Sequence, residues 1–266
     1  MLTDNDPFCC DVLRARVADG SLKGDVLQKD VRELTGDDLR PFRQVHLFAG
    51  IGGFALAQKW SGWPEDWSLV TGGPPCQPTS IAGAQRGEAD PRYLWPEMAR
   101  LIEERQPDFA LYENPTGTPE LAIDRVLVDL ESLGYEVGAY VIPACAVGAM
   151  HQRNRFWIVA HSGGIGCTNG ANLNGSYSQP SISNVGQLVA SKVQGNRELQ
   201  SDAHQIPCFG TGIPYGREER ATFIRRALCR EVHGLPDELD RIAALGNAIV
   251  PQVATVVMKA MIRATR

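Results

Sequence analysis

A cysteine in a proline-rich loop is the residue in this sequence best suited to covalent chemistry. Cys76 lies in the run GGPPCQPTS, residues 72–80, directly after a short apolar segment. Prolines stiffen the chain on both sides, and the polar residues that follow favour an exposed loop tip, so the thiol can act as a nucleophile. The alternative is a small buried thiol, which is our interpretation of most of the other cysteines.

A carboxylate and two arginines follow at the ends of later apolar segments. Glu113 comes directly after the segment Phe109–Tyr112, and Arg153 and Arg155 lie two apart in the run HQRNR. Residues two apart on a strand point to the same face, so both arginines are expected on one face of a strand over His151–Ala160. We therefore expect the carboxylate to face the same crevice as Cys76.

A glycine-rich block lies between an apolar segment and a helical pattern. The run HLFAGIGG, residues 46–53, is followed by helix formers over Phe54–Trp60. Glycines at such a turn let a nucleotide-like ligand approach the backbone and the free N–H groups of a helix N-terminus. Taken alone the signal is weak, because glycine turns are common in α/β proteins.

The elements that must position these residues alternate between strands and helices. Such alternation predicts an α/β fold with a doubly wound, mostly parallel sheet, Rossmann-like, whose ligands bind at the carboxyl ends of the strands. The expected strands are Val45–Phe48, Trp67–Val70, Phe109–Tyr112, Tyr135–Ile142 and Phe156–Ala160, and the expected helices are Phe54–Trp60, Leu94–Glu104, Leu121–Leu133 and Ile242–Ile262.

Length and composition narrow the classes of protein further. The chain has 266 residues, a hydrophobic fraction of 43% and a net charge of −5, which fit one sizeable core with a small second lobe. No stretch approaches the roughly 20 apolar residues of a membrane helix, and the start lacks the pattern of a signal peptide. We expect a cytoplasmic protein without membrane contact or disulfides.

The five blocks FAGIGG, GGPPCQPTS, ENP, HQRNR and ALGNAIVPQ occur in the order typical of DNA (cytosine-5) methyltransferases, and the chain resembles that family over residues 42–160 and 230–256. The resemblance implies that Cys76 attacks carbon 6 of a flipped-out cytosine and that Glu113 hydrogen-bonds or protonates ring nitrogen 3. Arg153 and Arg155 would support the base and the catalytic loop. The resemblance does not imply a metal ion. The implied S-adenosylmethionine ligands are Phe48, Gly50, Gly52 and Asn247.

The spacing of the blocks departs from the family pattern. The usual acidic segments for ribose and adenine do not fit between the glycine block and Cys76. Similar segments instead precede the glycine block, so the resemblance implies a rearranged cofactor half in which Asp4 binds the ribose hydroxyls, Asp6 lies beside it, and Asp30 contacts the adenine amino group. Asp25 competes with Asp30 for that role. The alternative is an acidic N-terminal extension whose similarity arose by chance.

The resemblance also implies double-stranded DNA as the partner. Residues 1–160 and 231–266 would form the catalytic domain and residues 161–230 a small target recognition region. Five arginines in residues 217–230 suit phosphate contacts. Two other readings stay open, a DNA-binding relative without the reaction and a pyrimidine-modifying enzyme with another donor. A monomer is the default, in a bacterial or phage setting.

Overall fold

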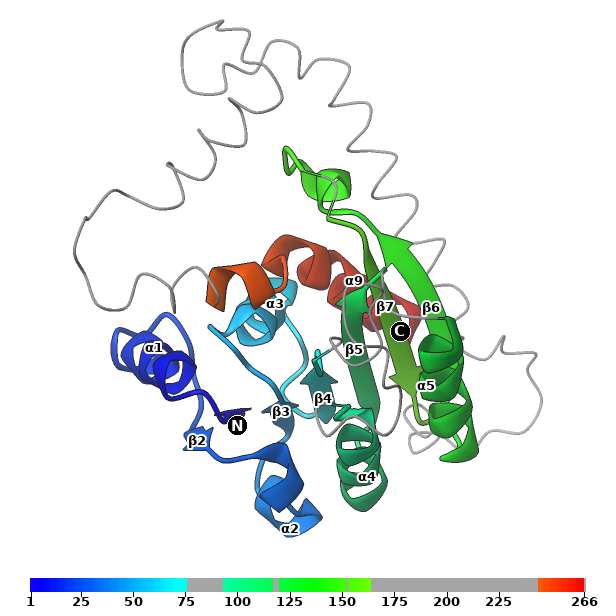
Figure 1. The fold of residues 1–266 in the computed structure, drawn as a ribbon, viewed down its shortest axis with the longest axis horizontal. Helices are drawn as coiled ribbons and strands as arrows, with labels where there is room; N and C mark the ends of the chain where they lie inside the picture. The colour runs from blue at the N-terminus through cyan, green and yellow to red at the C-terminus, as the bar shows by residue number, and fades with distance from the viewer. Residues whose placement is uncertain (76–92, 117–119, 152, 164–243, 266) are drawn as a thin grey trace, which may run out of the picture.

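The computed structural model describes residues 1–75, 93–116, 120–151, 153–163 and 244–265 (Figure 1). In this part of the chain a seven-stranded sheet has the order β2-β1-β3-β4-β5-β7-β6. The strands are β1 (Leu2–Asp4), β2 (Val26–Gln28), β3 (Gln44–His46), β4 (Leu69–Gly72), β5 (Phe109–Pro115), β6 (Glu136–Ile142) and β7 (Arg155–His161). The helices are α1 (Pro7–Ala18), α2 (Gly36–Leu39), α3 (Gly53–Ser61), α4 (Trp95–Arg105), α5 (Glu120–Ser132) and α9 (Pro251–Ala264), with short 3-10 turns η1 (Val31–Glu33) and η3 (Ala144–Val147).

The α/β fold class predicted from the sequence is confirmed. The first five strands in the chain pair in parallel, whereas β7 runs antiparallel to both of its neighbours, β5 and β6. The sheet is therefore mixed at one edge. β1 and β2 come before β3 and the glycine block in the sequence and lie on the outer side of β3 in the sheet. This is the order that the rearranged cofactor half requires, and it leaves the crevice beside β3 in place.

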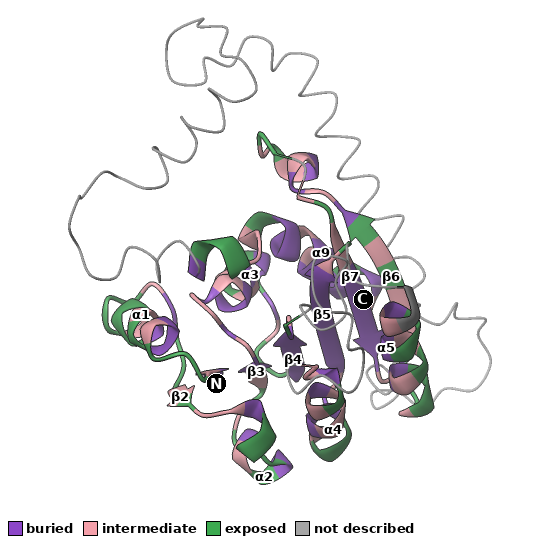
Figure 2. Ribbon diagram, viewed as in Figure 1, coloured by how far each residue is buried: buried purple, intermediate pink, exposed green. Residues whose placement is uncertain are grey.

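Both faces of the sheet are covered, which explains the nearly continuous apolar strands. Along β5, Phe109 and Leu111 pack in the cluster formed with α3 and α9, while Ala110 and Tyr112 pack in the cluster formed with α4 and α5. Figure 2 shows the central strands almost wholly buried between these helices. Alternate side chains thus enter opposite cores, as the period of two in a strand requires.

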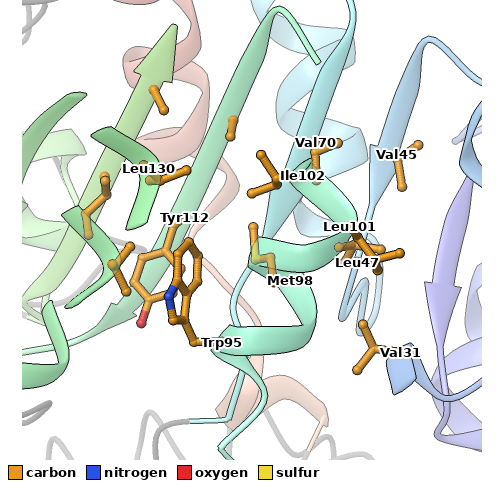
Figure 3. Close-up of a cluster of buried hydrophobic side chains, with 14 of the residues drawn as sticks. Val31, Val45, Leu47, Val70, Trp95, Met98, Leu101, Ile102, Tyr112 and Leu130 are labelled. Atoms are coloured by element: carbon orange, nitrogen blue, oxygen red, sulfur yellow. The ribbon is translucent and has the colours of Figure 1, made fainter. Parts of the chain in front are cut away.

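The core beneath α4 shows how the amphipathic pattern of that helix is used. The buried residues of α4 are Trp95, Met98, Leu101 and Ile102, spaced at three and four positions. Figure 3 shows them facing side chains from β3, β4 and β5. The Trp95 indole also donates a hydrogen bond to the Asp129 carboxylate at 2.9 Å, which ties α4 to α5.

The C-terminal helix packs back on the sheet, as predicted. The stretch Ala244–Ala264 is long and apolar enough to cross a membrane, with a mean hydropathy of 1.4 over its best window, which corrects our expectation that no segment approaches such a length. Within it, Val257, Met258 and Met261 are fully buried in the cluster shared with α3. Because a core helix needs the same composition, this packing accounts for the apolarity.

Candidate active site

A cavity of about 430 Å³ opens at the carboxyl ends of the parallel strands. Its size lies within the range of roughly 300–1,000 Å³ typical of small-molecule sites. Of the residues predicted for the site, those that line it are Asp4, Asp6, Phe48, Gly50, Glu113, Arg153, Arg155 and Asn247. Segments that are far apart in the sequence thus meet at one place.

The glycine block turns sharply between β3 and α3 to form one wall. Phe48 and Gly50 both have left-handed backbone conformations, with φ of 50° and 52°, and no atom lies within 4 Å of a side chain built on Gly50. The Asp4 carboxylate accepts a hydrogen bond from the Gly50 amide at 2.8 Å and another from the Asp6 amide at 3.0 Å. The first outer strand therefore fixes the loop, and each carboxylate oxygen keeps a lone pair for a further donor.

Buried polar groups fix the same loop from behind. The His46 ring lies 2.8 Å from the Thr71 hydroxyl and 2.9 Å from the Gln58 side-chain oxygen. Burial lowers the pKa of His46 to about 3, so the ring is neutral near pH 7. Since the Gln58 oxygen can only accept, Nε2 carries the proton and the Thr71 hydroxyl donates to Nδ1. This chain joins β3, α3 and β4.

Two residues expected in the cofactor site lie elsewhere. Gly52 does not line the cavity, and a side chain there would meet Leu22 at 2.5 Å and Leu13 at 3.1 Å. It is therefore required for packing of α3 against α1. Asp30 is also absent from the lining: its carboxylate is bound by Arg32 at 2.6 and 2.9 Å, caps the turn η1, and contacts the side chain of Asn5, which does line the cavity.

Glu113 and Arg155 form a buried ion pair at the cavity. Nε of Arg155 lies 3.0 Å from Oε1 of Glu113, which is 7% exposed. Burial raises the pKa of Glu113 to about 7, and the nearby guanidinium groups of Arg155 and Arg153 oppose that shift. A carboxyl group with such a pKa can hold or release a proton near neutral pH.

Arg153 lies in the cavity wall but not on the predicted strand. β7 begins at Arg155, and Arg153 precedes it with a φ of 38°, so the expectation that the two arginines share one face of a strand is wrong. The Arg153 guanidinium instead donates from Nη2 to the carbonyls of Gly246 at 2.8 Å and Ala248 at 2.7 Å. Both arginines still reach the cavity, because the bend before β7 turns Arg153 toward it.

Cys76 lies outside the described residues, but the loop that leads to it is fixed. Pro74 and Pro75 line the cavity, and the Asn114 side chain donates a hydrogen bond to the Pro74 carbonyl at 3.0 Å. Neighbouring residues on β5 thus have separate tasks, since Glu113 faces the cavity and Asn114 anchors the Pro74 loop. The predicted recognition region falls almost wholly on residues 164–243, also outside the described part.

Among the cavity residues that sequence reasoning missed, Asn5 and Cys9 carry polar side-chain atoms. They line the cavity next to Asp4 and Asp6. Asp6 caps α1 by accepting from the Phe8 amide at 2.9 Å, so the first turn of α1 carries Cys9 to the wall. The aspartate followed by proline predicts this helix start and was the signal available.

The doubly wound sheet, the glycine turn and the buried carboxylate–guanidinium pair at one strand-end cavity define the class of Rossmann-like methyltransferases. The chain has the same fold as the Dnmt2 methyltransferase of S. pombe, with a TM-score of 0.54, 16% identity and coverage of 98% of this chain and 90% of that one. The methyltransferase EhMeth of Entamoeba histolytica matches with a TM-score of 0.53, 14% identity and coverage of 100% and 90%.

The profile of the family C-5 cytosine-specific DNA methylase matches residues 57–205, and the chain belongs to this family. The type II methylase M.HgiEI of Herpetosiphon aurantiacus is 29% identical over 163 residues, covering 46% of this chain and 37% of that protein. The type II methyltransferase M.AplI of Arthrospira platensis is 34% identical over 154 residues, covering 44% and 45%. The chain therefore matches less than half of the length of these curated relatives.

Proposed function

We propose that this protein methylates carbon 5 of cytosine in double-stranded DNA with S-adenosylmethionine as the donor. The observation that carries the proposal is the meeting of the Glu113–Arg155 pair and the Asp4-anchored glycine turn at a single cavity. Family membership supports the same reaction. A base site and a donor site that share one cavity are what direct transfer between two bound molecules needs.

The residues of the cavity fit the proposed donor. The open left-handed turn at Gly50 leaves room for a ligand against the backbone, and the Asp4 carboxylate supplies acceptors for ribose hydroxyls. Phe48 adds an aromatic surface, and Asn247 offers an amide on the opposite wall. When bound, the donor supplies an electrophilic methyl group on a sulfonium. Asn5, which lines the cavity and hydrogen-bonds Asp30, is the proposed polar contact for the adenine end, with Asp30 behind it.

The chain's own groups activate the base. Carbon 5 of cytosine is a weak nucleophile until the thiolate of Cys76 adds to carbon 6. Glu113 donates a proton or a hydrogen bond to ring nitrogen 3 as that bond forms, which spreads the developing negative charge. Arg155 orients the Glu113 carboxyl through its 3.0 Å contact. After transfer, loss of the proton on carbon 5 and departure of the thiolate restore the aromatic ring.

The target base must leave the helix to reach this cavity. Carbon 6 is hidden in stacked duplex DNA, so we propose that the cytosine is flipped out of the stack. Residues 161–230 are the proposed target recognition region, and the arginines of residues 217–230 are proposed to contact phosphates.

Cytosine-methylation sequencing of plasmid DNA from a methylase-free bacterial host tests this function. We expect methylated cytosines within one short motif when the wild-type chain is expressed, and none with Cys76→Ala at equal soluble protein. The Cys145→Ala variant is the control, since Cys145 does not line the cavity. An unmodified plasmid with folded wild-type protein, or full methylation by Cys76→Ala, would contradict the proposal.

A further inference from the structure

We infer that Arg153 is a positioning residue that holds the Gly246–Ala248 wall of the cavity in place and so sets the affinity for the methyl donor. This inference rests on the proposed function. It differs from the role implied by resemblance, in which Arg153 supports the base. The juxtaposition of one guanidinium with two carbonyls of the opposite wall carries it.

The contacts of Arg153 join two segments of the chain that lie far apart in the sequence. Nη2 of Arg153 lies 2.8 Å from the Gly246 carbonyl and 2.7 Å from the Ala248 carbonyl, 93 and 95 residues along the chain. These carbonyls flank Asn247, which lines the cavity. The guanidinium therefore determines where the Asn247 backbone stands.

The wall that Arg153 holds contains a short helical turn, in which the Ala248 amide donates to the Ala244 carbonyl at 3.0 Å. Gly246 and Asn247 are exposed, and the stretch from Ala248 to Val250 separates a short helical turn from α9. A second hollow, lined by Val147, His151 and Leu245 among others, lies behind Arg153 and shares Ala248 with the main cavity. The hydrogen bonds from Arg153 therefore add to the backbone bond of the turn and to the packing of Ile249 against the core, and they act on the side of the turn where Gly246 and Asn247 are exposed.

The backbone at Arg153 is built for this contact. Its φ of 38° is rare for a residue with a side chain and persists only where surrounding contacts hold it. Nε of Arg153 is buried and has no hydrogen-bond partner among the described residues, so a charged donor is kept at the wall. Arg155, only two residues on, binds Glu113 instead. The two arginines therefore divide the cavity between a donor wall and a base wall.

Lysine at position 153 separates charge from geometry. Both hydrogen bonds come from the terminal Nη2 of Arg153, and a lysine keeps the charge but is shorter, so its ammonium group does not reach the position between the two carbonyls. Loss of hydrogen bonds from a charged donor corresponds to about a tenfold or larger loss of affinity for a ligand bound by that wall. We expect the dissociation constant for S-adenosylmethionine to rise by that factor in Arg153→Lys.

The test compares the full-length wild type with Arg153→Lys and a matched control, Arg105→Lys. Arg105 also donates from its guanidinium to a backbone carbonyl, that of Phe42 at 3.0 Å, but does not line the cavity. Calorimetric titration gives the affinity for S-adenosylmethionine. Hydrogen exchange of the peptide covering residues 244–250 in the free protein reports the wall without any ligand. Single-turnover methylation at saturating donor gives the rate of transfer.

The expected result is a weaker affinity and faster exchange over residues 244–250 in Arg153→Lys, with a transfer rate within about threefold of the wild type once the donor is saturating. The control keeps wild-type values in all three measurements. In Arg153→Ala, added guanidinium ion should restore part of the affinity, which a merely unfolded variant would not show.

The outcomes separate the inference from the proposed function. Unchanged exchange over residues 244–250, or unchanged affinity, in Arg153→Lys overturns the inference while leaving the function intact. A transfer rate that falls at saturating donor, with unchanged affinity for the donor, would instead support a role for Arg153 in holding the base. A wild type that binds no S-adenosylmethionine overturns the proposed function, and the exchange data still decide whether Arg153 holds the wall.

Discussion

Two opposing effects determine the pKa of the Glu113 carboxyl group. Burial raises its pKa to about 7, while Arg155 and Arg153 pull it down. The carboxyl group is therefore divided between its two forms near neutral pH. A pyrimidine ring that gains negative charge needs a proton donor at that pH, and a fully ionised carboxylate does not provide one.

We predict that Glu113→Gln lowers the methylation rate by about 10²–10⁴-fold, because the amide keeps the size and a hydrogen-bond donor but transfers no proton. In the wild type the rate should fall as the pH rises through about 7, since the active form is the protonated one. Transfer of a labelled methyl group to plasmid DNA across this pH range measures both effects.

The residual activity of the glutamine variant should lack this fall near pH 7. Circular dichroism shows whether the variant is folded. A decline that persists with the same midpoint in Glu113→Gln would assign the titration to another group and contradict the role of Glu113.

Burial of Glu113 also has a consequence for stability. Its pKa is raised in the folded state, so the folded protein holds this proton more tightly than the unfolded chain does. The contribution of this group to stability is complete below the unfolded pKa of about 4.5 and is lost as the pH rises through about 7. The site thus has a cost in stability at the pH where it works.

At the scale of elements, α3 begins and ends at glycines that have different tasks. Gly52 and Gly62 cap the two ends with φ of 90° and 69°. A side chain at Gly62 would meet no atom within 4 Å, whereas one at Gly52 would meet Leu22 at 2.5 Å. An alanine at either position would adopt a strained left-handed backbone conformation, and at position 52 it would also clash with Leu22.

We predict that Gly52→Ala destabilises the protein by about 2–4 kcal/mol and Gly62→Ala by about 1 kcal/mol. The difference between them isolates the contact with Leu22, and the double variant Gly52→Ala/Leu22→Ala should lose less than the sum of the single variants. Urea unfolding of the wild type, the three single variants (Gly52→Ala, Gly62→Ala and Leu22→Ala) and the double variant measures these free energies. Equal losses for the two glycine variants would mean that Leu22 and Leu13 shift freely to make room.

The elements were largely predictable from the sequence, because their signals are local. The pattern of α4 and the glycine stop after α5 each lie within one segment, and both helices are found near the expected bounds. The bend before β7 was missed, since alternation along a strand does not show where the strand begins. Arg153 therefore lies outside the strand to which spacing assigned it.

The same contrast between local signals and contacts in space applies to the residues of the candidate site. Asp4, Glu113 and Asn247 belong to short blocks that are recognisable one at a time, and all three line the cavity. Asp30 and Gly52 do not line the cavity: the carboxylate of Asp30 is bound by Arg32, and Gly52 packs against Leu22 and Leu13. These contacts depend on partners in space, which spacing along the sequence does not show.

At the scale of the whole molecule, the cavity joins the two ends of the described chain. Asp4 on β1 anchors Gly50 after β3, and Arg153 before β7 holds the Gly246–Ala248 wall. β1 is joined to the segment of β3 by backbone hydrogen bonds from His46 to Met1 and from Ala49 to Thr3, both 2.9 Å, and the Asp4 bond to Gly50 continues this series at the cavity. A ligand that contacts Asp4 therefore adds to the same seam between the outer strands and the rest of the sheet.

We predict that S-adenosylmethionine stabilises the wild type against unfolding, by about 2.7 kcal/mol at a concentration one hundred times its dissociation constant. Asp4→Asn should be less stable by about 1–3 kcal/mol without ligand, because the new amide presents hydrogen atoms to the Gly50 or Asp6 amide that the carboxylate accepted. At the same ligand concentration its gain in stability should be smaller than that of the wild type. Thermal unfolding with and without ligand measures both quantities.

Asp11→Asn is the matched control. Asp11 is an exposed carboxylate on α1 that pairs with Arg14 at 2.8 Å and does not line the cavity. An exposed pair of this kind contributes little to stability, so the control should keep both the wild-type stability and the full gain from the ligand. If Asp4→Asn shows the same gain as Asp11→Asn, the outer strands take no part in binding the donor. The rearranged N-terminal segment would then complete the sheet without completing the site.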